Sequence, residues 1–374
     1  MNSTERHAAR RRRREPERAA RRAERQRGCD LDAITDMNAL YRAQRQAARG
    51  VSWKASTQRY QINWLLNIHR MRWDLIEGRS IHRGFHEFDL FERGKKRHIS
   101  SVHFSERVPQ KALAQNVLIP CLTPRLIGRN TANIKGRGLS CALDGLRRDL
   151  TRHVRRHGVE GYILLTDFSG YFGSLDHGHV AEMLVENVAD ERALTMALAL
   201  LDLQGDVGLG LGCEPNQIEA VAYPDRIDHY VTEVLRPEAY GRYMDDAYML
   251  DPSKEHLQWC LQEFAGMCGR YGLAVNAKKT RIVKLTKGFT WLKKRVHLSG
   301  SGRIVMRPSR ETVTRERRKL KRMARAADEG RLDGAAVARS YQSWRGSLVG
   351  LDAFGTVAAM DRAYKQLVKG AGND

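Results

Sequence analysis

The sequence lacks the features of a membrane-spanning or secreted protein. No apolar run approaches the roughly 18 residues that a membrane-spanning helix needs, and the arginine-rich start has no apolar segment like that of a secretory signal. The six cysteines form no Cys-x-x-Cys pair, so neither a cysteine-ligated zinc site nor a disulfide framework is predicted. These absences predict a soluble protein in the reducing cytoplasm, with no membrane partner.

Acidic residues are few relative to basic ones. The 374 residues include 65 Lys and Arg against 43 Asp and Glu, a formal net charge of +22 at pH 7. Such an excess favours a polyanionic partner, above all nucleic acid, although a generic basic surface would carry the same charge. The length predicts two or three domains, and 42% hydrophobic residues suffice for a substantial core.

The imbalance is greatest in residues 1–28, which contain eleven Arg and four Glu. Apart from Met1 they include no large apolar residue, so we expect a basic disordered arm, or a lone solvated helix, until the segment meets an anion. An RNA-gripping tail is the favoured interpretation. A merely solubilising leader is the alternative.

Two adjacent carboxylates stand between short apolar runs in Tyr243-Met244-Asp245-Asp246. The pattern predicts a strand, a tight turn and a second strand, with the acidic pair at the tip, because Asp tolerates the unusual backbone geometry of such turns. The two groups repel unless a cation lies between them, and hard divalent ions take carboxylate oxygens. An ordinary acidic turn is the alternative.

A third carboxylate, Asp167, ends a continuous apolar run that begins at Tyr162, as is typical of a buried strand. The chain continues as Phe168-Ser169-Gly170-Tyr171-Phe172. The two acidic segments resemble motifs A and C of reverse transcriptases, which read Asp-aromatic-x-x-aromatic-aromatic and Tyr-x-Asp-Asp.

This resemblance implies an α+β right-hand polymerase with fingers, a palm built on an antiparallel sheet, and a helical thumb. It implies catalytic roles for Asp167, Asp245 and Asp246. These three, with Phe168, would form the site of two Mg²⁺ ions, for which Mn²⁺ could substitute. Phe172 would be the steric gate that rejects ribose at the nucleotide site. Both phenylalanines could instead be core aromatics.

Between the acids, Gly208 to Gln217 occupies the position of motif B, which usually reads Gln-Gly-x-x-x-Ser-Pro. Here Leu211 replaces the Gln, Gly212 is kept, and Asn216 with Gln217 replaces Ser-Pro. This form resembles the group II intron-like bacterial and phage enzymes, closest to those of diversity-generating retroelements, prophages and antiviral defence. It implies nucleotide-binding roles for Leu211, Gly212 and Gln217. A glycine-rich structural loop is the alternative.

Several cations resemble residues that approach phosphate in this family. A short antiparallel strand pair is expected at residues 85–104, with Arg97 inside it and Arg107 just after it. Both arginines would contact the nucleotide or template. Contacts with nucleic acid would come from Lys135, Arg137, Lys293, Lys294, Arg317 and Arg318. The segment from Leu273 to Thr280 resembles motif D of this family, in which a lysine would act as general acid towards pyrophosphate. Lys278 is the candidate for this catalytic role, and Lys279 stays open for the same role. A solvated face or a structural ion pair is the alternative for these cations.

We therefore expect four consecutive segments: a basic disordered arm (1–28), N-terminal helices and fingers (29–150), a palm (151–300) and a helical basic thumb (301–374). The expected partners are an RNA template, a DNA primer or product, deoxynucleoside triphosphates, and a cognate noncoding RNA or small accessory protein. A role in a prophage or a diversity-generating retroelement is the preferred expectation for the biological role. Anti-phage defence is the alternative, followed by an RNA-dependent RNA polymerase or an inactive RNA-binding protein.

The departure at Leu211 generates a test of base selection. In the usual motif the Gln packs near the nascent base pair, so the aliphatic Leu211 is expected to loosen base selection. Leu211→Gln should therefore lower misincorporation at template adenines several-fold, as measured by sequencing the cDNA. Unchanged misincorporation at those positions would contradict the hypothesis.

Overall fold

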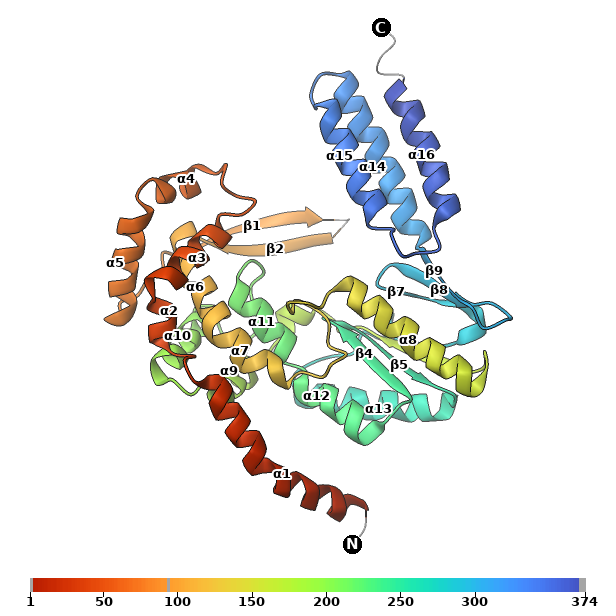
Figure 1. The fold of residues 1–374 in the computed structure, drawn as a ribbon, viewed down its shortest axis with the longest axis horizontal. Coiled ribbons are helices and arrows are strands. Elements are labelled where there is room, and N and C mark those ends of the chain that lie inside the picture. Colours follow the sequence, from red (N-terminus) through yellow and green to blue (C-terminus); the bar gives the residue numbers. More distant parts are fainter. Residues whose placement is uncertain (1–2, 93–94, 370–374) are drawn as a thin grey trace. The chain divides into compact units, whose positions relative to one another are not determined.

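The computed structural model describes residues 3–92 and 95–369, which form helices and three antiparallel sheets (Figure 1). The helices are α1 (Ser3–Gln26), α2 (Leu31–Thr35), α3 (Met37–Ala47), α4 (Ala55–Ile62), α5 (Trp64–Ile76), α6 (Phe104–Leu113), α7 (Ile119–Leu122), α8 (Leu139–His157), α9 (His177–Asn187), α10 (Glu191–Asp202), α11 (Glu214–Ala222), α12 (Asp225–Tyr230), α13 (Lys254–Arg270), α14 (Arg310–Asp328), α15 (Gly334–Gly346) and α16 (Phe354–Lys369). The strands are β1 (Phe85–Glu92), β2 (Lys95–Val102), β3 (Tyr162–Thr166), β4 (Ala239–Tyr243), β5 (Asp246–Asp251), β6 (Arg281–Lys284), β7 (Phe289–Trp291), β8 (Lys294–Leu298) and β9 (Ile304–Pro308). Among the described helices, none combines the length and the apolar stretch needed to cross a membrane.

The chain forms two compact units and passes between them several times. The first unit contains residues 1–138, 168–235 and 262–276, and the second contains residues 139–167, 236–261 and 277–374. These interleaved units differ from the four consecutive segments expected: the boundary at 150 falls inside α8, and the one at 300 separates the paired strands β8 and β9. The units are interleaved because β3 pairs with β5 and β6, which are distant from it along the chain.

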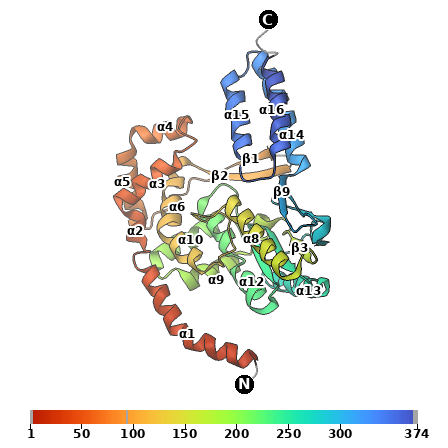
Figure 2. The same cartoon turned by 45° about the vertical axis from the view of Figure 1, so that its right-hand side comes forward.

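The second unit is built on a four-stranded sheet in the order β4-β5-β3-β6. Helix α8 lies beside the sheet (Figures 1 and 2). Leu146 and Leu150, one turn apart on α8, share a buried core with Ile163 and Leu165 of β3 and Tyr248 of β5. Burying one such side chain stabilises the fold by about 1.5 to 3 kcal/mol, so this core fixes α8 to the sheet.

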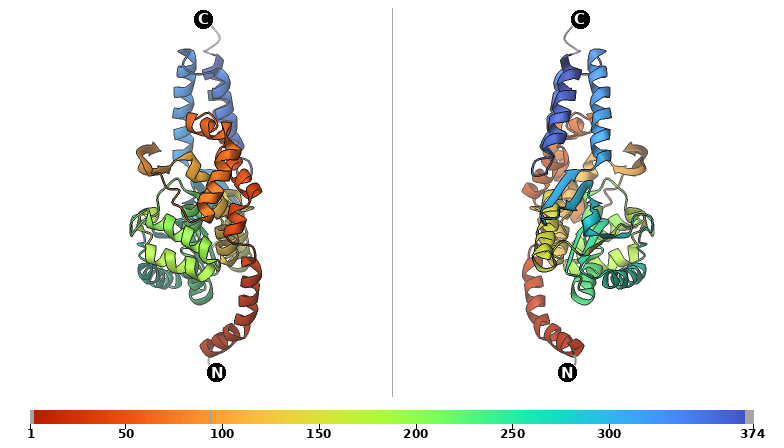
Figure 3. Two further views of the ribbon diagram at one scale, coloured as in Figure 1. Left: turned by 90° about the vertical axis from the view of Figure 1, so that its left-hand side faces the viewer. Right: turned by 90° about the vertical axis from the view of Figure 1, so that its right-hand side faces the viewer.

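A three-stranded sheet, β7-β8-β9, and the helices α14, α15 and α16 complete the second unit. The three helices lie side by side (Figures 1 and 3) around a core that includes Leu320, Tyr341, Trp344 and Met360. The expected basic helical C-terminal part is therefore present, but the helices begin at Arg310 rather than at residue 301, because β9 precedes them.

The first unit contains the strand pair β1–β2 and the remaining helices except α13, which the boundary after Leu261 divides between the two units. The antiparallel pair expected over residues 85–104 is confirmed, while Arg93 and Gly94 of its expected turn lie outside the described residues. The segment expected to be disordered, or a lone solvated helix, is the helix α1. Its many Ala, Arg and Glu residues are strong helix formers, which accounts for the second of those alternatives.

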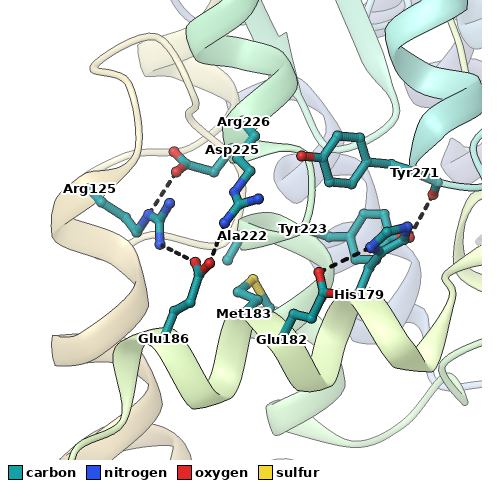
Figure 4. A pocket seen from close by; sticks show the side chains of 10 residues that line it. All are labelled: Arg125, His179, Glu182, Met183, Glu186, Ala222, Tyr223, Asp225, Arg226 and Tyr271. Carbon is teal, nitrogen blue, oxygen red and sulfur yellow. Dashed lines mark hydrogen bonds and ion pairs between the residues drawn. The ribbon is translucent and has the colours of Figure 1, made fainter.

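Ion pairs hold α9 to α12 in the first unit. The guanidinium of Arg125 donates to Asp225 at 2.7 Å, and Arg226 pairs with Glu186 (Figure 4). The cavity between them is only about 30 Å³, room for about one water molecule. Because these charges pair with one another, the cluster has a structural role rather than being a ligand site.

The segment that follows the glycine-rich loop forms two helices, α11 and α12. Pro224 separates them, since a proline has no backbone N–H to continue the hydrogen-bond ladder. Glu219 lies on the buried side of α11 with 2% of its surface exposed. Burial raises the pKa of Glu219 from its ordinary 4.5 to about 8, because the charged carboxylate loses its water.

Glu219 should make the protein less stable as the pH rises. Because its folded-state pKa lies above the unfolded value, stability is greatest below about pH 4.5 and falls as the pH rises through about 8. Glu219→Gln should remove this loss. From about pH 5 to about pH 8.5, the free energy of unfolding of the variant should therefore rise by roughly 1 to 3 kcal/mol relative to that of the wild type. Urea unfolding at both pH values measures it. The exposed Glu191→Gln is the control, and equal pH dependence in the wild type and Glu219→Gln would contradict the expectation.

Candidate active site

The acidic pair lies on the hairpin formed by β4 and β5, as predicted. Tyr243 pairs with Asp246 across the ladder, which leaves Met244 and Asp245 as a two-residue turn. The expectation that Asp would take the unusual backbone geometry is wrong: Met244 has the positive φ, +54°. Asp245 is therefore the second residue of the turn, and Asp246 is the first residue of β5.

A buried arginine supports this turn. Arg242 is 1% exposed, and its Nη1 donates to the backbone carbonyl of Met244 at 3.0 Å. A buried charge is costly unless it is paired and hydrogen-bonded, so this contact also stabilises one backbone conformation of the hairpin tip. Arg242 was not among the residues predicted from the sequence. Its signal was a charged residue within an otherwise apolar strand.

Asp167 directly follows β3 and lies beside the hairpin, since Thr166 pairs with Ala247 of β5. It is 4% exposed. Oxygens of Asp167, Asp245 and Asp246 all lie within 4.8 Å of one another. The three predicted acids, from two distant segments of the chain, thus form one cluster.

The charges of this cluster oppose one another. Burial and the neighbouring Asp245 and Asp167 raise the pKa of Asp246 to about 7, because a second and third negative charge disfavour ionisation. A bound cation would reverse that effect. The donor set consists of carboxylate oxygens, which are the ligands of Mg²⁺ and Mn²⁺, so these residues are suited to hold the ions that the sequence analysis named.

Lys279 lies at the acidic cluster. Its Nζ donates to Asp167 Oδ2 at 2.6 Å, and its side chain is half exposed. Partial burial alone would lower the pKa of Lys279. The hydrogen bond to Asp167 and the charge of that carboxylate outweigh this effect and raise the pKa, so the ammonium is retained. The sequence left open whether Lys278 or Lys279 serves the site. The contact with Asp167 favours Lys279 over the named Lys278.

The second predicted lysine pair, Lys293 and Lys294, lies at the turn between β7 and β8. Leu292 and Lys293 both have positive φ, as in a tight hairpin turn. Lys293 is exposed, and its charge is among those that lower the pKa of Asp246. The expectation that Lys294 contacts nucleic acid does not agree with its position, because alternation along β8 points this residue inward and leaves it 7% exposed.

In the first unit, a groove of about 930 Å³ brings four of the predicted binding residues together: Arg107, Lys135, Gly212 and Gln217. Arg107 Nη2 donates to Ser101 Oγ at 2.8 Å, while its buried Nε has no hydrogen-bond partner. Gln217 accepts a hydrogen bond from Asn133 at 3.2 Å. The groove therefore offers a cationic wall and amide groups to an anionic or nucleotide ligand.

The glycine-rich loop is fixed by two amide side chains that the sequence analysis did not select together. Asn216 Nδ2 donates to Gln204 Oε1 at 2.6 Å and to the Gly210 carbonyl at 2.8 Å. Gly212 has φ +126°, a backbone conformation that glycine adopts readily and that other residues rarely adopt. The amide at Asn216 thus holds the loop that precedes α11.

The other predicted residues have separate positions. Phe168 is a core aromatic, stacked on Tyr171 with ring centroids 5.2 Å apart, so its side chain offers nothing to a metal. Phe172 is half-buried, and its carbonyl accepts from the backbone N–H of Leu209 at 2.7 Å. Leu211 is half-buried in the same loop.

Of the remaining cations, one has a structural use. Arg137 donates to the carbonyls of Ile127 and Asn130 at 3.1 and 2.8 Å, so its guanidinium supports a loop instead of standing open to phosphate as expected. Arg97, Arg317 and Arg318 are exposed, the first on β2 and the other two on α14. These three remain predicted nucleic-acid or nucleotide contacts.

No protein-family model matches the sequence, and no curated protein matches it. Similar solved structures include apo telomerase from Candida tropicalis (10% identity, TM-score 0.49, covering 65% of this chain and 52% of that chain) and a form truncated from its C-terminal domain (10%, 0.46, 59% and 54%). Telomerase from Candida albicans in complex with a TWJ fragment of telomeric RNA is also similar (12%, 0.46, 76% and 54%). The chain spans about half the length of these telomerases, and TM-scores below 0.5 do not by themselves establish a common fold.

The contact between Lys279 and Asp167 makes a prediction about metal affinity. The ammonium competes with a divalent ion for the same carboxylate oxygen. Lys279→Met should therefore bind Mn²⁺ or Mg²⁺ about fivefold more tightly in the absence of nucleotide, because a partly exposed ion pair is worth about 1 kcal/mol. Titration followed by Mn²⁺ electron paramagnetic resonance measures this. Lys284→Met, which breaks the surface pair with Glu160, is the control. Unchanged or weaker affinity in Lys279→Met would contradict the competition.

Proposed function

We propose that this protein is an RNA-directed DNA polymerase that extends a primer by two-metal nucleotidyl transfer. The observation that carries the proposal is the cluster of Asp167, Asp245 and Asp246, in which oxygens from a strand end and a hairpin tip lie within 4.8 Å of one another. Its order along the chain and its Tyr-Met-Asp-Asp hairpin are those of motifs A and C. The formal charge of +22 supports a nucleic-acid substrate.

The acidic cluster would hold the metal ions, and its neighbours would keep it in place. When bound, two Mg²⁺ ions would supply positive charge to the attacking 3′-hydroxyl and to the leaving pyrophosphate. The buried Arg242 holds the backbone of the turn and so keeps Asp245 in position. Positioning of this kind is the main contribution of a protein to phosphoryl transfer.

Lys279 would exchange partners during the reaction. In the structure its ammonium bonds to Asp167. When the carboxylate takes up a metal ion, the half-exposed lysine chain would turn towards the leaving pyrophosphate and donate a proton to it, which eases its departure.

The template, the primer and the incoming nucleotide would use the remaining predicted residues. The groove lined by Arg107, Lys135 and Gln217 is suited in charge to a triphosphate or template backbone. The exposed Arg317 and Arg318 of α14 would contact phosphates of the duplex, in a helical thumb. Phe172 would act as the gate that favours deoxynucleotides over ribonucleotides.

The biological role rests on the resemblance of the motif B segment. We propose a cytoplasmic enzyme of the group II intron-like bacterial or phage lineage, serving a prophage or a diversity-generating retroelement. An adjacent accessory-protein gene with a near-duplicate variable repeat would support that role. A neighbouring structured noncoding RNA without repeats would favour anti-phage defence instead.

Primer extension tests the catalytic assignment. Asp245→Asn combined with Asp246→Asn keeps the side-chain volumes but removes two metal-binding charges, so extension of a DNA primer on an RNA template with Mg²⁺ should fall by about a thousandfold or more. Deoxynucleotides should be used in preference to ribonucleotides. The control, Asp202→Asn with Asp206→Asn, removes two exposed charges elsewhere and should extend normally. Undiminished extension by the first double variant would overturn the assignment.

A further inference from the structure

The second unit contains another cluster of potential metal ligands, formed by His153, His157 and Glu238. Within the described part of the chain it is one of two such groups, and its ligand atoms all lie within 4.8 Å of one another. The two histidines stand four residues apart on α8, with ring centroids 5.0 Å apart. Glu238 directly precedes β4, at the opposite end of that strand from Asp245. We call this group the His-Glu cluster.

The hydrogen bonds of His153 indicate which nitrogen is available. The ring is completely buried, and its Nε2 lies 2.7 Å from the carbonyl oxygen of Glu160. Because a carbonyl can only accept, Nε2 carries the proton, and in the neutral ring Nδ1 has a lone pair. That nitrogen faces the carboxylate of Glu238 directly. A backbone carbonyl that orients a histidine through its other nitrogen is the usual outer partner of a metal ligand.

In the neutral form of His153, Nδ1 and the Glu238 carboxylate are two electron-pair donors that face each other in a buried place, whereas a proton on Nδ1 would make an ordinary ion pair. A shared cation would satisfy both. Gly161 makes room for the arrangement, since a Cβ at that position would lie 2.4 Å from His153 Nε2.

The second carboxylate oxygen of Glu238 faces two basic side chains. Its Oε1 is buried and accepts no hydrogen bond, and the side chain is 9% exposed. His157 Nε2 lies 3.8 Å away, too far for a hydrogen bond but close to the separation of roughly 3.3 Å expected between two ligands of one tetrahedral ion. Arg156, at 3.7 Å from the same oxygen, is mostly exposed and can turn to solvent when an ion is present.

We propose that the His-Glu cluster binds one divalent first-row transition metal ion, Zn²⁺ above all, through His153 Nδ1, His157 and Glu238. Two imidazoles and one carboxylate suit Zn²⁺, whereas Mg²⁺ prefers the all-oxygen set of the acidic cluster. The ion joins α8 to the start of β4, the strand that leads to the Tyr-Met-Asp-Asp turn. The proposal stands independently of the proposed polymerase activity.

Zinc uptake by the full-length protein tests the site. After treatment with a chelator, the wild type in excess Mg²⁺ should take up one equivalent of Zn²⁺, measured by elemental analysis and by competition with a chromophoric chelator, and its melting temperature should rise. His157→Ala removes a 39% exposed side chain and should fold. We expect its affinity for zinc to fall by more than the roughly 10- to 100-fold that loss of an outer partner costs, and Glu238→Gln should behave likewise.

Matched variants separate this site from others. His256→Ala removes a histidine that also contacts a carboxylate, Asp251, but belongs to no such cluster, and it should bind zinc like the wild type. Asp245→Asn with Asp246→Asn should also retain zinc, because it alters only the acidic cluster. Absence of zinc uptake by the wild type, which would leave His153 and Glu238 as a plain ion pair, would overturn the proposal. Equal affinity in the wild type and His157→Ala would overturn it too.

Discussion

The pairing of β3 with β5 holds the candidate active site together, because it brings Asp167 beside the hairpin that carries Asp245 and Asp246. Three carboxylates at this separation repel one another, so the packing around them has to resist that repulsion. The core beneath α8 supplies part of this resistance. A hydrogen bond of 2.7 Å from the Tyr248 hydroxyl to Asp149 joins α8 to β5, two residues beyond Asp246.

The cations around the acids divide into one that is fixed and others that can exchange. Arg242 is buried and bonded to the turn, so it remains in place whether or not a metal is bound. Lys279 and Lys293 are exposed at their ends, and a long flexible side chain can leave its partner at little cost. The same negative charge can therefore be balanced by lysine in the free protein and would be balanced by metal ions in the proposed reaction. Because lysine balances this charge when no metal is bound, the protein can stay folded around three carboxylates that repel one another.

Features that depend on local pattern could be predicted from the sequence. The hairpins at β1–β2 and β4–β5 follow from apolar runs flanking turn residues, and the three acids follow from residue type and order. Features that depend on packing between distant segments could not be predicted. Gly241 lies opposite Tyr248, and a Cβ there would lie 2.6 Å from the Tyr248 ring, a requirement that exists only once the strands are paired. The burial of Lys294 depends in the same way on which face of β8 meets the core.

The two ends of β4 differ in the chemistry of their side chains. One end leads to the carboxylates of Asp245 and Asp246, and the other begins at Glu238, with two histidines beside it. Carboxylate oxygens suit Mg²⁺ and Mn²⁺, whereas imidazole nitrogens suit Zn²⁺ and the other later transition metal ions. The two proposed sites would then take different ions without displacing each other. Because β4 is a five-residue strand hydrogen-bonded to β5, constraining its start against α8 limits how far its end can move. The position of the turn, which the proposed two-metal chemistry would require to be precise, would therefore depend on contacts at the opposite end of the same strand.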